Sequence, residues 1–201
     1  MANTRIKRSF DILASFFGLL FLSPLFFLCS ILIKLNDNGP IFFKQKRVGR
    51  GGRVFSLYKF RTMSVLESAK DGLFEPGNLS RITSVGKFLR KTKLDELPQL
   101  INVLKGDMSL VGPRPKVEKW VEEYHEKWEG ILSLKPGITD NASIEFRDEE
   151  ELLSRSSDPE DTYRNVILPR KLDLYNDYVQ NHKFFGDMRI IFITLKVLMF
   201  K

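Results

Sequence analysis

One uncharged stretch near the amino terminus limits what this chain can fold into more than any other feature. Residues 12–33 contain 22 amino acids without a single charge, and Leu, Phe and Ile dominate them. As a straight α-helix the stretch would be roughly 33 Å long, about the thickness of the hydrocarbon core of a bilayer. A membrane segment is therefore expected. No small-x-small cleavage site follows, which argues against a removable signal peptide.

A helix breaker lies in the middle of this stretch. Pro24, which follows Ser23, removes a backbone N–H and collides with the preceding turn, so a sharp kink is predicted there. Each arm is then about 10–13 residues long, too short to cross a bilayer. Basic residues flank both ends of the stretch: Arg5, Lys7, Arg8, Lys34, Lys44, Lys46 and Arg47. Because Lys and Arg stay on the cytoplasmic side, the pattern fits a re-entrant helical hairpin, with a kinked transmembrane anchor as the alternative.

The carboxyl terminus carries a second candidate membrane element. In residues 187–201, Arg189 and Lys196 are seven positions apart and share one face of a helix, while apolar residues cover most of the remainder. This pattern is typical of a helix that lies in the membrane interface. A helix buried in the protein core is the alternative.

Composition and charge add two further constraints. Two His and one Cys leave nothing from which to build a zinc site or a disulfide framework, which favours a reducing compartment. Residues 1–115 carry 19 Lys and Arg against 8 Asp and Glu, a net charge of +11, whereas the remainder carries −4. An anionic partner is therefore expected for the first part: nucleic acid, an acidic membrane surface or a phosphorylated substrate.

Between the termini, the pattern predicts a small mixed domain. Apolar residues 41–43 and 54–63 flank a glycine-rich turn at 49–52, which predicts a β-hairpin with basic rims. That turn resembles a phosphate-binding loop, but no helix follows it, so an ordinary hairpin turn is favoured.

Helix signals dominate the rest of the chain. Helices are expected after a cap at Ser84, from about 96 to 105, from about 116 to 130, and over 168–179. Gly106 is expected to end the second of these. Pro113-Arg114-Pro115 predicts a rigid loop, and Pro136-Gly137 predicts a turn that opens an acidic region.

The Asp95-Glu96 pair is the leading candidate for chemistry. It lies at the predicted start of a helix, where Asp is a favoured cap and acidic residues complement the helix dipole. The alternative is an ionised carboxylate that acts as a nucleophile or metal ligand. Adjacent carboxylates suit Mg²⁺, which takes one or two of them together with phosphate oxygens. The candidate phosphate-binding cations are Lys59, Arg61, Arg90 and Arg114.

Several ordered motifs carry a family resemblance. They are the basic amino terminus, the apolar run broken at Ser23-Pro24, and the segments 58–63 (YKFRTM), 94–100 (LDELPQL), 102–109 (NVLKGDMS) and 111–115 (VGPRP). With these motifs the chain resembles the bacterial sugar transferases known as monotopic phosphoglycosyl transferases, in their minimal catalytic form. The likeness extends over nearly the whole chain.

This resemblance implies both a fold and an activity. The implied fold is α/β and membrane-associated, with a re-entrant broken helix over 1–35, a small β-hairpin or sheet, and several amphipathic interfacial helices. Residues 36–201 would form a cytoplasmic catalytic domain that ends in an interfacial helix. The implied activity is transfer of a sugar 1-phosphate from a UDP-sugar to a polyprenyl phosphate such as undecaprenyl phosphate, with release of UMP. This reaction would begin a glycoconjugate pathway at the cytoplasmic face of a bacterial inner membrane.

The resemblance also implies roles for individual residues. The position matching Asp95 attacks the sugar-bearing phosphate and forms a covalent intermediate, and the position matching Glu96 binds Mg²⁺. The residues expected to bind substrate are Lys59, Arg61, Arg90, Pro113, Arg114 and Pro115. Membrane lipids are implied as partners and nucleic acid is not, while a homodimer is compatible with the family.

The chain departs from the family pattern at two places. After 135–139 most members continue with Gly-Trp, whereas here Asp140 opens an acidic stretch that reaches Glu151, which leaves the sugar open. Tyr175 stands where the family often has an aspartate. The rival hypothesis is a membrane-anchored basic module that binds nucleic acid or acidic lipid without catalysis. Its binding would weaken steeply with salt and would be indifferent to Asp95→Asn.

Overall fold

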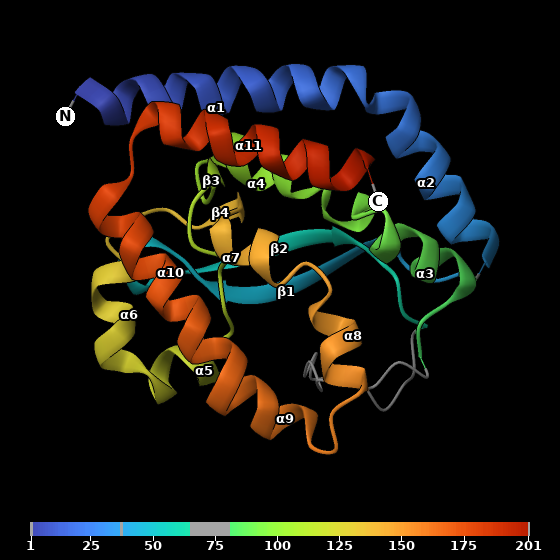
Figure 1. Cartoon of the computed structure of the whole chain (residues 1–201). Helices are drawn as coiled ribbons and strands as arrows, with labels where there is room; N and C mark the ends of the chain where they lie inside the picture. The colour runs from blue at the N-terminus through green and yellow to red at the C-terminus, as the bar shows by residue number, and fades with distance from the viewer. Residues whose placement is uncertain (1, 37, 65–80, 201) are drawn as a thin grey trace.

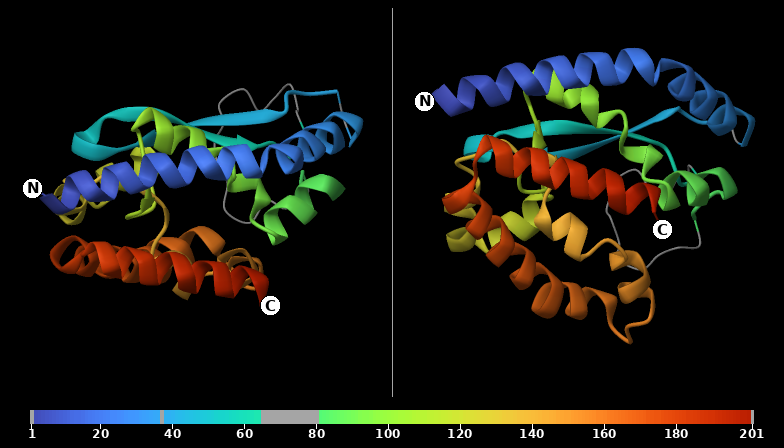
Figure 2. Two further views of the ribbon diagram at one scale, coloured as in Figure 1. Left: turned by 90° about the horizontal axis from the view of Figure 1, so that it is seen from above. Right: turned by 45° about the horizontal axis from the view of Figure 1, so that its top comes forward.

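Helices surround two small sheets at the centre of the molecule (Figure 1). The computed structural model describes residues 2–36, 38–64 and 81–200. Two helices from opposite ends of the chain, α1 (Ala2–Phe21) and α11 (Phe184–Met199), lie side by side on the face seen in the left view of Figure 2. A helix-rich structure with small sheets is consistent with the α/β class expected from the sequence.

The larger sheet is the hairpin that the sequence predicts. Strands β1 (Phe42–Val48) and β2 (Val54–Phe60) pair antiparallel, with Phe42 opposite Phe60. Gly51 and Gly52 take positive φ values of 65° and 76° in the turn, which a residue without a Cβ adopts readily. Strand β1 extends beyond the apolar triplet 41–43, and β2 ends at Phe60, three residues before the end of the predicted run 54–63. Backbone pairing between the strands, and not the extent of the apolar run, sets their lengths.

The smaller sheet was not predicted. Strands β3 (Ser109–Val111) and β4 (Gly137–Thr139) pair in parallel, so Pro136-Gly137 leads into a strand and the prediction of a turn there was wrong. The backbones approach closely after β3: a Cβ on Gly137 would lie 2.1 Å from the nitrogen of Gly112. Long-range pairing of this kind leaves no periodic signal in so short a segment.

Most predicted helices form, with shifted ends. Helix α3 (Ser84–Lys91) is capped by Thr83, whose Oγ1 accepts from the Gly86 N–H (2.9 Å), and not by Ser84. The expected helix over 116–130 is broken at Tyr124 into α5 (Glu118–Glu123) and α6 (His125–Ile131). The other helical elements that follow the amino-terminal pair are the 3₁₀ helices η1 (Arg50–Gly52) and η2 (Leu94–Glu96), the π-helix η3 (Tyr163–Ile167), and the helices α4 (Gln99–Lys105), α7 (Asn141–Glu145), α8 (Glu149–Ser154), α9 (Pro159–Thr162) and α10 (Leu168–Asn181).

The apolar amino-terminal stretch forms two helices with a bend between them. Helix α1 ends at Phe21, α2 (Ser23–Asn36) begins two residues later, and the pair is bent by 60°. Ser23 Oγ donates to the Leu20 carbonyl at the bend (2.8 Å), so the kink predicted at Ser23-Pro24 is confirmed. Over the described ranges, no single helix is long and apolar enough to cross a membrane, whereas this bent pair together meets both criteria.

Helix α1 turns its polar side chains toward the rest of the molecule. It starts at Ala2, so the first arm is longer than predicted and includes the basic amino terminus. Lys7 Nζ lies 2.5 Å from an Asp187 carboxylate oxygen, and Arg8 donates to two carbonyl groups at the end of α4 (2.7 and 3.1 Å). Asp11 accepts from a backbone N–H of β3 (3.1 Å). These positions share one helix face, so α1 lies flat along the domain.

Helices α1, α2 and α11 each expose an apolar face on the side away from the domain. We call this surface the outer apolar face. On α1 and α2 it comprises Leu13, Phe16, Phe17, Leu20, Phe21, Phe27, Leu28, Ile31 and Leu35, and on α11 it comprises Phe185, Phe192, Leu195, Leu198 and Met199. Of the α11 residues, Asp187 and Ile190 alone are buried, so this helix is not a buried core helix.

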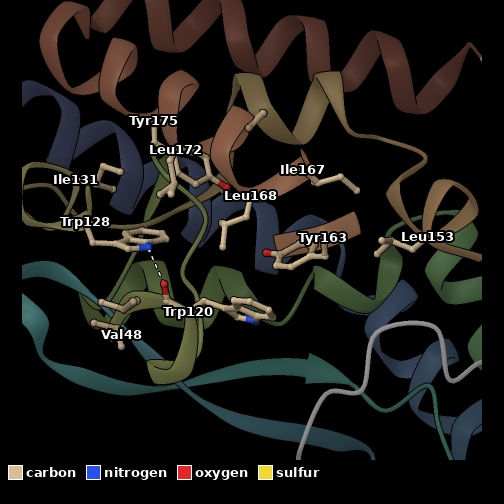
Figure 3. Packing of buried hydrophobic residues seen from close by; sticks show 12 residues of the cluster. Val48, Trp120, Trp128, Ile131, Leu153, Tyr163, Ile167, Leu168, Leu172 and Tyr175 are labelled. Carbon is tan, nitrogen blue, oxygen red and sulfur yellow. Dashed lines mark hydrogen bonds between the residues drawn. The ribbon is translucent and has the colours of Figure 1, made fainter. Parts of the chain in front are cut away.

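The main hydrophobic core lies between α5, α6 and α10 (Figure 3). Two tryptophans anchor it, and Trp128 Nε1 donates to the Trp120 carbonyl (3.1 Å). A second cluster, which contains Cys29 and Ile33 of α2 with Phe60 of β2, fixes the inner side of the bent pair to the hairpin. The core thus holds the central strands against both ends of the chain.

Candidate active site

A backbone turn at Lys93 directs the acidic pair toward the hairpin. Lys93 takes φ 58° and ψ 14°, in the left-handed region that residues with a side chain rarely adopt. The turn ends α3 and starts η2, which carries Asp95 and Glu96. Strain of this kind persists only where the surrounding structure holds it, and it is common at functional sites.

Asp95 does not act as a helix cap. Lys93 occupies the cap position of η2 and Pro98 that of α4, and neither position has a side-chain cap. Asp95 is 6% exposed, and its Oδ1 accepts no hydrogen bond from any described residue. Its Oδ2 lies 3.6 Å from Lys59 Nζ. The cap hypothesis is therefore wrong, and in the part of the chain that the structure describes one oxygen of this buried carboxylate has no hydrogen-bond partner.

Glu96, in contrast, is held tightly by two cations. Its Oε1 accepts from Lys59 Nζ (2.9 Å) and from Arg114 Nη2. Arg114 also donates through Nη1 to the Ile138 carbonyl of β4 (3.2 Å). Strand β2, the loop after β3 and strand β4 therefore meet at this one carboxylate.

The two carboxylates lie in opposite electrostatic environments. Burial alone would raise the pKa of Glu96, but the charges of Arg114 and Lys59 hold it well below its usual range. Burial raises the pKa of Asp95, and the charge of Glu96 adds to this effect while Lys59 opposes it. Neighbouring carboxyl groups that differ in this way are suited to separate chemical roles.

Arg61 and Arg90 are engaged elsewhere. Arg61 is buried, and its Nε donates to the Pro40 carbonyl (2.5 Å) at the start of the hairpin. Arg90 pairs with Glu150 at the start of α8, with Nε 3.1 Å from the carboxylate. Of the four predicted phosphate-binding cations, the structure brings Lys59 and Arg114 to the acidic pair.

The two prolines of the Pro-Arg-Pro loop fix its path through their carbonyl groups. Pro113 accepts from the Gly137 N–H of β4 (3.0 Å), and Pro115 accepts from Arg47 Nη1 (3.4 Å). Both contacts hold the backbone on either side of Arg114. Rigidity of the loop stays a prediction, and these two contacts are consistent with it.

A buried polar cluster behind this loop was missed by the sequence analysis. Lys116 Nζ donates to Tyr163 Oη (2.5 Å), and burial lowers the pKa of Lys116 to about 8. Lys171 pairs with Glu149, and Asp140 accepts from the Ser143 N–H (2.8 Å). These residues are scattered between 116 and 171, and only the tertiary fold brings them together, so no local motif signals them. The acidic stretch thus supplies internal ion pairs.

Comparisons with known proteins show which family the chain resembles. A family model for bacterial sugar transferases matches residues 2–201. The chain is 38% identical to the uncharacterized sugar transferase EpsL of Bacillus subtilis, over 95% of this chain and 86% of the relative.

Two longer relatives are also similar. The UDP-glucose:undecaprenyl-phosphate glucose-1-phosphate transferase of Escherichia coli is 36% identical over 96% of this chain and 40% of the relative. The UDP-N-acetylgalactosamine-undecaprenyl-phosphate N-acetylgalactosaminephosphotransferase of Aeromonas hydrophila is also 36% identical, over 96% of this chain and 44% of the relative. The chain spans less than half the length of these two proteins.

The ties of Glu96 can be tested by a double-mutant cycle. Arg114→Met leaves a buried carboxylate with Lys59 as its remaining cation, so we expect the free energy of unfolding to fall by about 2–3 kcal/mol. Adding Glu96→Gln removes the buried charge that has lost one of its two cations and should restore part of this loss. Urea unfolding in detergent measures both effects. Arg155→Met, which breaks one exposed ion pair with Glu151, is the control and should change stability little. Equal losses from both arginine variants would contradict the expected burial effect.

Proposed function

Because the chain belongs to the bacterial sugar transferase family, we propose that it transfers a sugar 1-phosphate from a UDP-sugar to undecaprenyl phosphate and releases UMP. The observation that carries the proposal is the buried Asp95 carboxylate: its Oδ1 has no hydrogen-bond partner among the described residues, and the charge of the adjacent Glu96 is compensated by Lys59 and Arg114. The names of the two longer relatives support the substrate class, since one specifies UDP-glucose and the other UDP-N-acetylgalactosamine. The reaction serves polysaccharide or other glycoconjugate synthesis, and its sugar is open.

In the proposed mechanism Asp95 is the nucleophile. A lone pair of Oδ1 forms a bond to the phosphorus that carries the sugar, and the bond from this phosphorus to the UMP oxygen breaks, with the electron pair leaving on UMP. An oxygen of undecaprenyl phosphate then attacks the same phosphorus and displaces the Asp95 carboxylate. Each step forms one P–O bond and breaks another. A carboxylate engaged as a cap would be hindered in this role, and Asp95 has no such engagement.

The cations beside the pair neutralise developing charge. Lys59 reaches both carboxylates, and Arg114 lies on the opposite side of Glu96. Both side chains are partly exposed, so an anionic phosphate can approach them. Fixed positive groups of this kind stabilise negative charge that forms in a phosphoryl transition state. Substrate binding by the other predicted residues, including Arg61 and Arg90, stays a prediction from the family resemblance.

The acidic pair also fits Mg²⁺. Over the described ranges, no group of three or more His, Cys, Asp or Glu side chains is placed to hold a metal. Two carboxylates suffice for Mg²⁺, which completes its shell with water and substrate phosphate oxygens. We propose that Glu96, whose Oε1 accepts from both Lys59 and Arg114, would hold the ion. When bound, Mg²⁺ would offset the charge of the donor diphosphate.

We further propose that the chain lies at the cytoplasmic face of a bacterial inner membrane, with α1 and α2 as a re-entrant pair. The outer apolar face supports this placement, because α1 presents exposed Phe and Leu outward while its charged side chains bind the domain. An amphipathic element of this kind rests in the membrane interface. Undecaprenyl phosphate is itself a membrane lipid, so the acceptor would reach the site from the same surface.

UMP release tests the activity. Detergent-solubilised protein is mixed with Mg²⁺, undecaprenyl phosphate and a panel that includes UDP-glucose, UDP-galactose and UDP-N-acetylgalactosamine. We expect release with one or a few of these sugars, and a loss of about 1000-fold or more in Asp95→Asn. Asp158→Asn, at an exposed aspartate that caps α9, is the matched control and should keep wild-type release. UMP release at the wild-type rate in Asp95→Asn would refute the role of Asp95 as the nucleophile.

Chelation tests the metal. We expect EDTA to stop UMP release and added Mg²⁺ to restore it. Glu96→Gln should raise the Mg²⁺ concentration for half-maximal release by about tenfold or more, because a ligand charge is lost. Undiminished UMP release in EDTA would contradict the proposed requirement for Mg²⁺.

Cysteine labelling tests the topology. In a Cys29→Ala background, single cysteines replace Thr4, before the uncharged stretch, and Asn38, after it. A re-entrant pair places both positions on the cytoplasmic side, so an impermeant maleimide should label both in inverted vesicles. Labelling of the two positions from opposite sides would instead show a spanning anchor.

A further inference from the structure

A buried ionic contact holds three helices together at one point. Asp187, in the first turn of α11, is 2% exposed and accepts from two side chains. Tyr178 Oη of α10 donates to its Oδ1 (2.7 Å), and Lys7 Nζ of α1 donates to its Oδ2 (2.5 Å). A buried carboxylate is costly unless it is paired and hydrogen-bonded, and here both of its oxygens are satisfied.

The same contact reaches the backbone of strand β3. Lys7 Nζ also donates to the Val111 carbonyl (2.9 Å), and Tyr178 Oη lies 3.3 Å from that oxygen. A tyrosine hydroxyl has a single proton, which the shorter contact assigns to Asp187, so the Val111 carbonyl is bound by Lys7. Asp187 is the one carboxylate that pairs with Lys7 among the described residues, and it therefore holds the ammonium group against β3.

Helix α11 is attached to strand β4 as well. Thr139 Oγ1 of β4 and Thr194 Oγ1 of α11 are 2.7 Å apart, and Thr194 donates to the Ile190 carbonyl of its own helix (2.8 Å). The proton between the two hydroxyls therefore comes from Thr139. Both strands of the small sheet are thus bound on the inner side of α11, whose other side belongs to the outer apolar face.

The small sheet carries this attachment to Arg114. The Gly137 N–H of β4 donates to the Pro113 carbonyl (3.0 Å), and a Cβ on Gly137 would lie 2.1 Å from the Gly112 nitrogen, so the two backbones move together. Arg114 comes next in the chain and donates to a carbonyl of β4 (3.2 Å) and to Glu96. A shift of β3 against α11 would therefore move the Arg114 guanidinium relative to Glu96.

We infer that Asp187 is a positioning residue for Arg114: through Lys7 and strand β3 it fixes where the Arg114 guanidinium lies beside the acidic pair. This inference rests on the proposed function, in which Arg114 neutralises charge that develops on the phosphoryl group. Such stabilisation depends on groups that are already in place, and a small misplacement caused by a distant change lowers the rate. Asp187 itself would touch no substrate atom.

Asp187→Asn tests the inference. The amide keeps an acceptor for Tyr178 and removes the charge that holds Lys7, whose side chain is 21% exposed and can then turn to water. We expect kcat for UMP release to fall by about tenfold while KM for the UDP-sugar changes by less than about threefold. The matched control is Asp177→Asn, at an exposed aspartate of α10 that accepts from Asn181, and it should keep wild-type kcat. Wild-type kcat in Asp187→Asn would overturn the inference.

A double-mutant cycle separates positioning from a general loss of structure. Asp187 can act through Arg114 only while Arg114 is present. In an Arg114→Met background, Asp187→Asn should therefore lower kcat by less than about twofold. Urea unfolding in detergent first establishes that each variant is folded. A role in stability alone predicts the same fractional loss of kcat in both backgrounds, and that result would overturn the inference.

Failure of this inference can be distinguished from failure of the proposed function. Absence of UMP release by wild type with every sugar refutes the proposed function and this inference with it. Release by wild type with equal release by Asp187→Asn refutes this inference alone. If Asp187→Asn does not fold, Tyr178→Phe carries the same cycle, because it removes one donor to Asp187 and leaves the ion pair with Lys7 intact. No loss of kcat in Tyr178→Phe, or an equal loss with and without Arg114, would likewise overturn the inference.

Discussion

The inward-facing charges of α1 determine how the rest of the molecule is arranged. Lys7 binds Asp187 of α11, Arg8 binds the end of α4, and Asp11 binds β3. A helix held to a domain through its polar face must present its apolar face outward, which reverses the usual orientation in water. The same contacts place the carboxyl-terminal helix beside the amino-terminal one and join α1 to β3 and to α4, the helix that follows the acidic pair in the chain.

The two carboxylates of the candidate site differ in how the protein holds them: Glu96 is restrained and Asp95 is not. Glu96 receives two cations and links three segments, so its position is set by the fold. Asp95, its neighbour in sequence, keeps one oxygen without a hydrogen-bond partner among the described residues. An unpaired buried group of this kind reduces stability, so its presence beside a fully paired carboxylate calls for an explanation.

The sequence predicted features that local chemistry decides. Pro24 marks the kink, the glycine-rich turn marks the hairpin, and Gly106 ends α4 with a φ of 90°. Features set by tertiary contacts were not predicted correctly: the β3–β4 pair, the break at Tyr124, and the position of Asp95 outside any cap. The motifs identified the acidic pair. The buried cluster around Lys116 depends on residues far apart in the chain and was invisible to local analysis.

Gly112 and Gly137 limit how the loop and the strand at the site can vary. A side chain at either position would collide with backbone of the opposite segment, at 2.6 Å or less, so the loop bearing Arg114 and strand β4 are joined without adjustable packing. A substitution at either glycine would therefore move the loop and the strand apart and displace Arg114 from Glu96. The acidic stretch that follows β4 is anchored as well, through Asp140 and the Glu149–Lys171 ion pair, so a change in its length would be transmitted to the same loop.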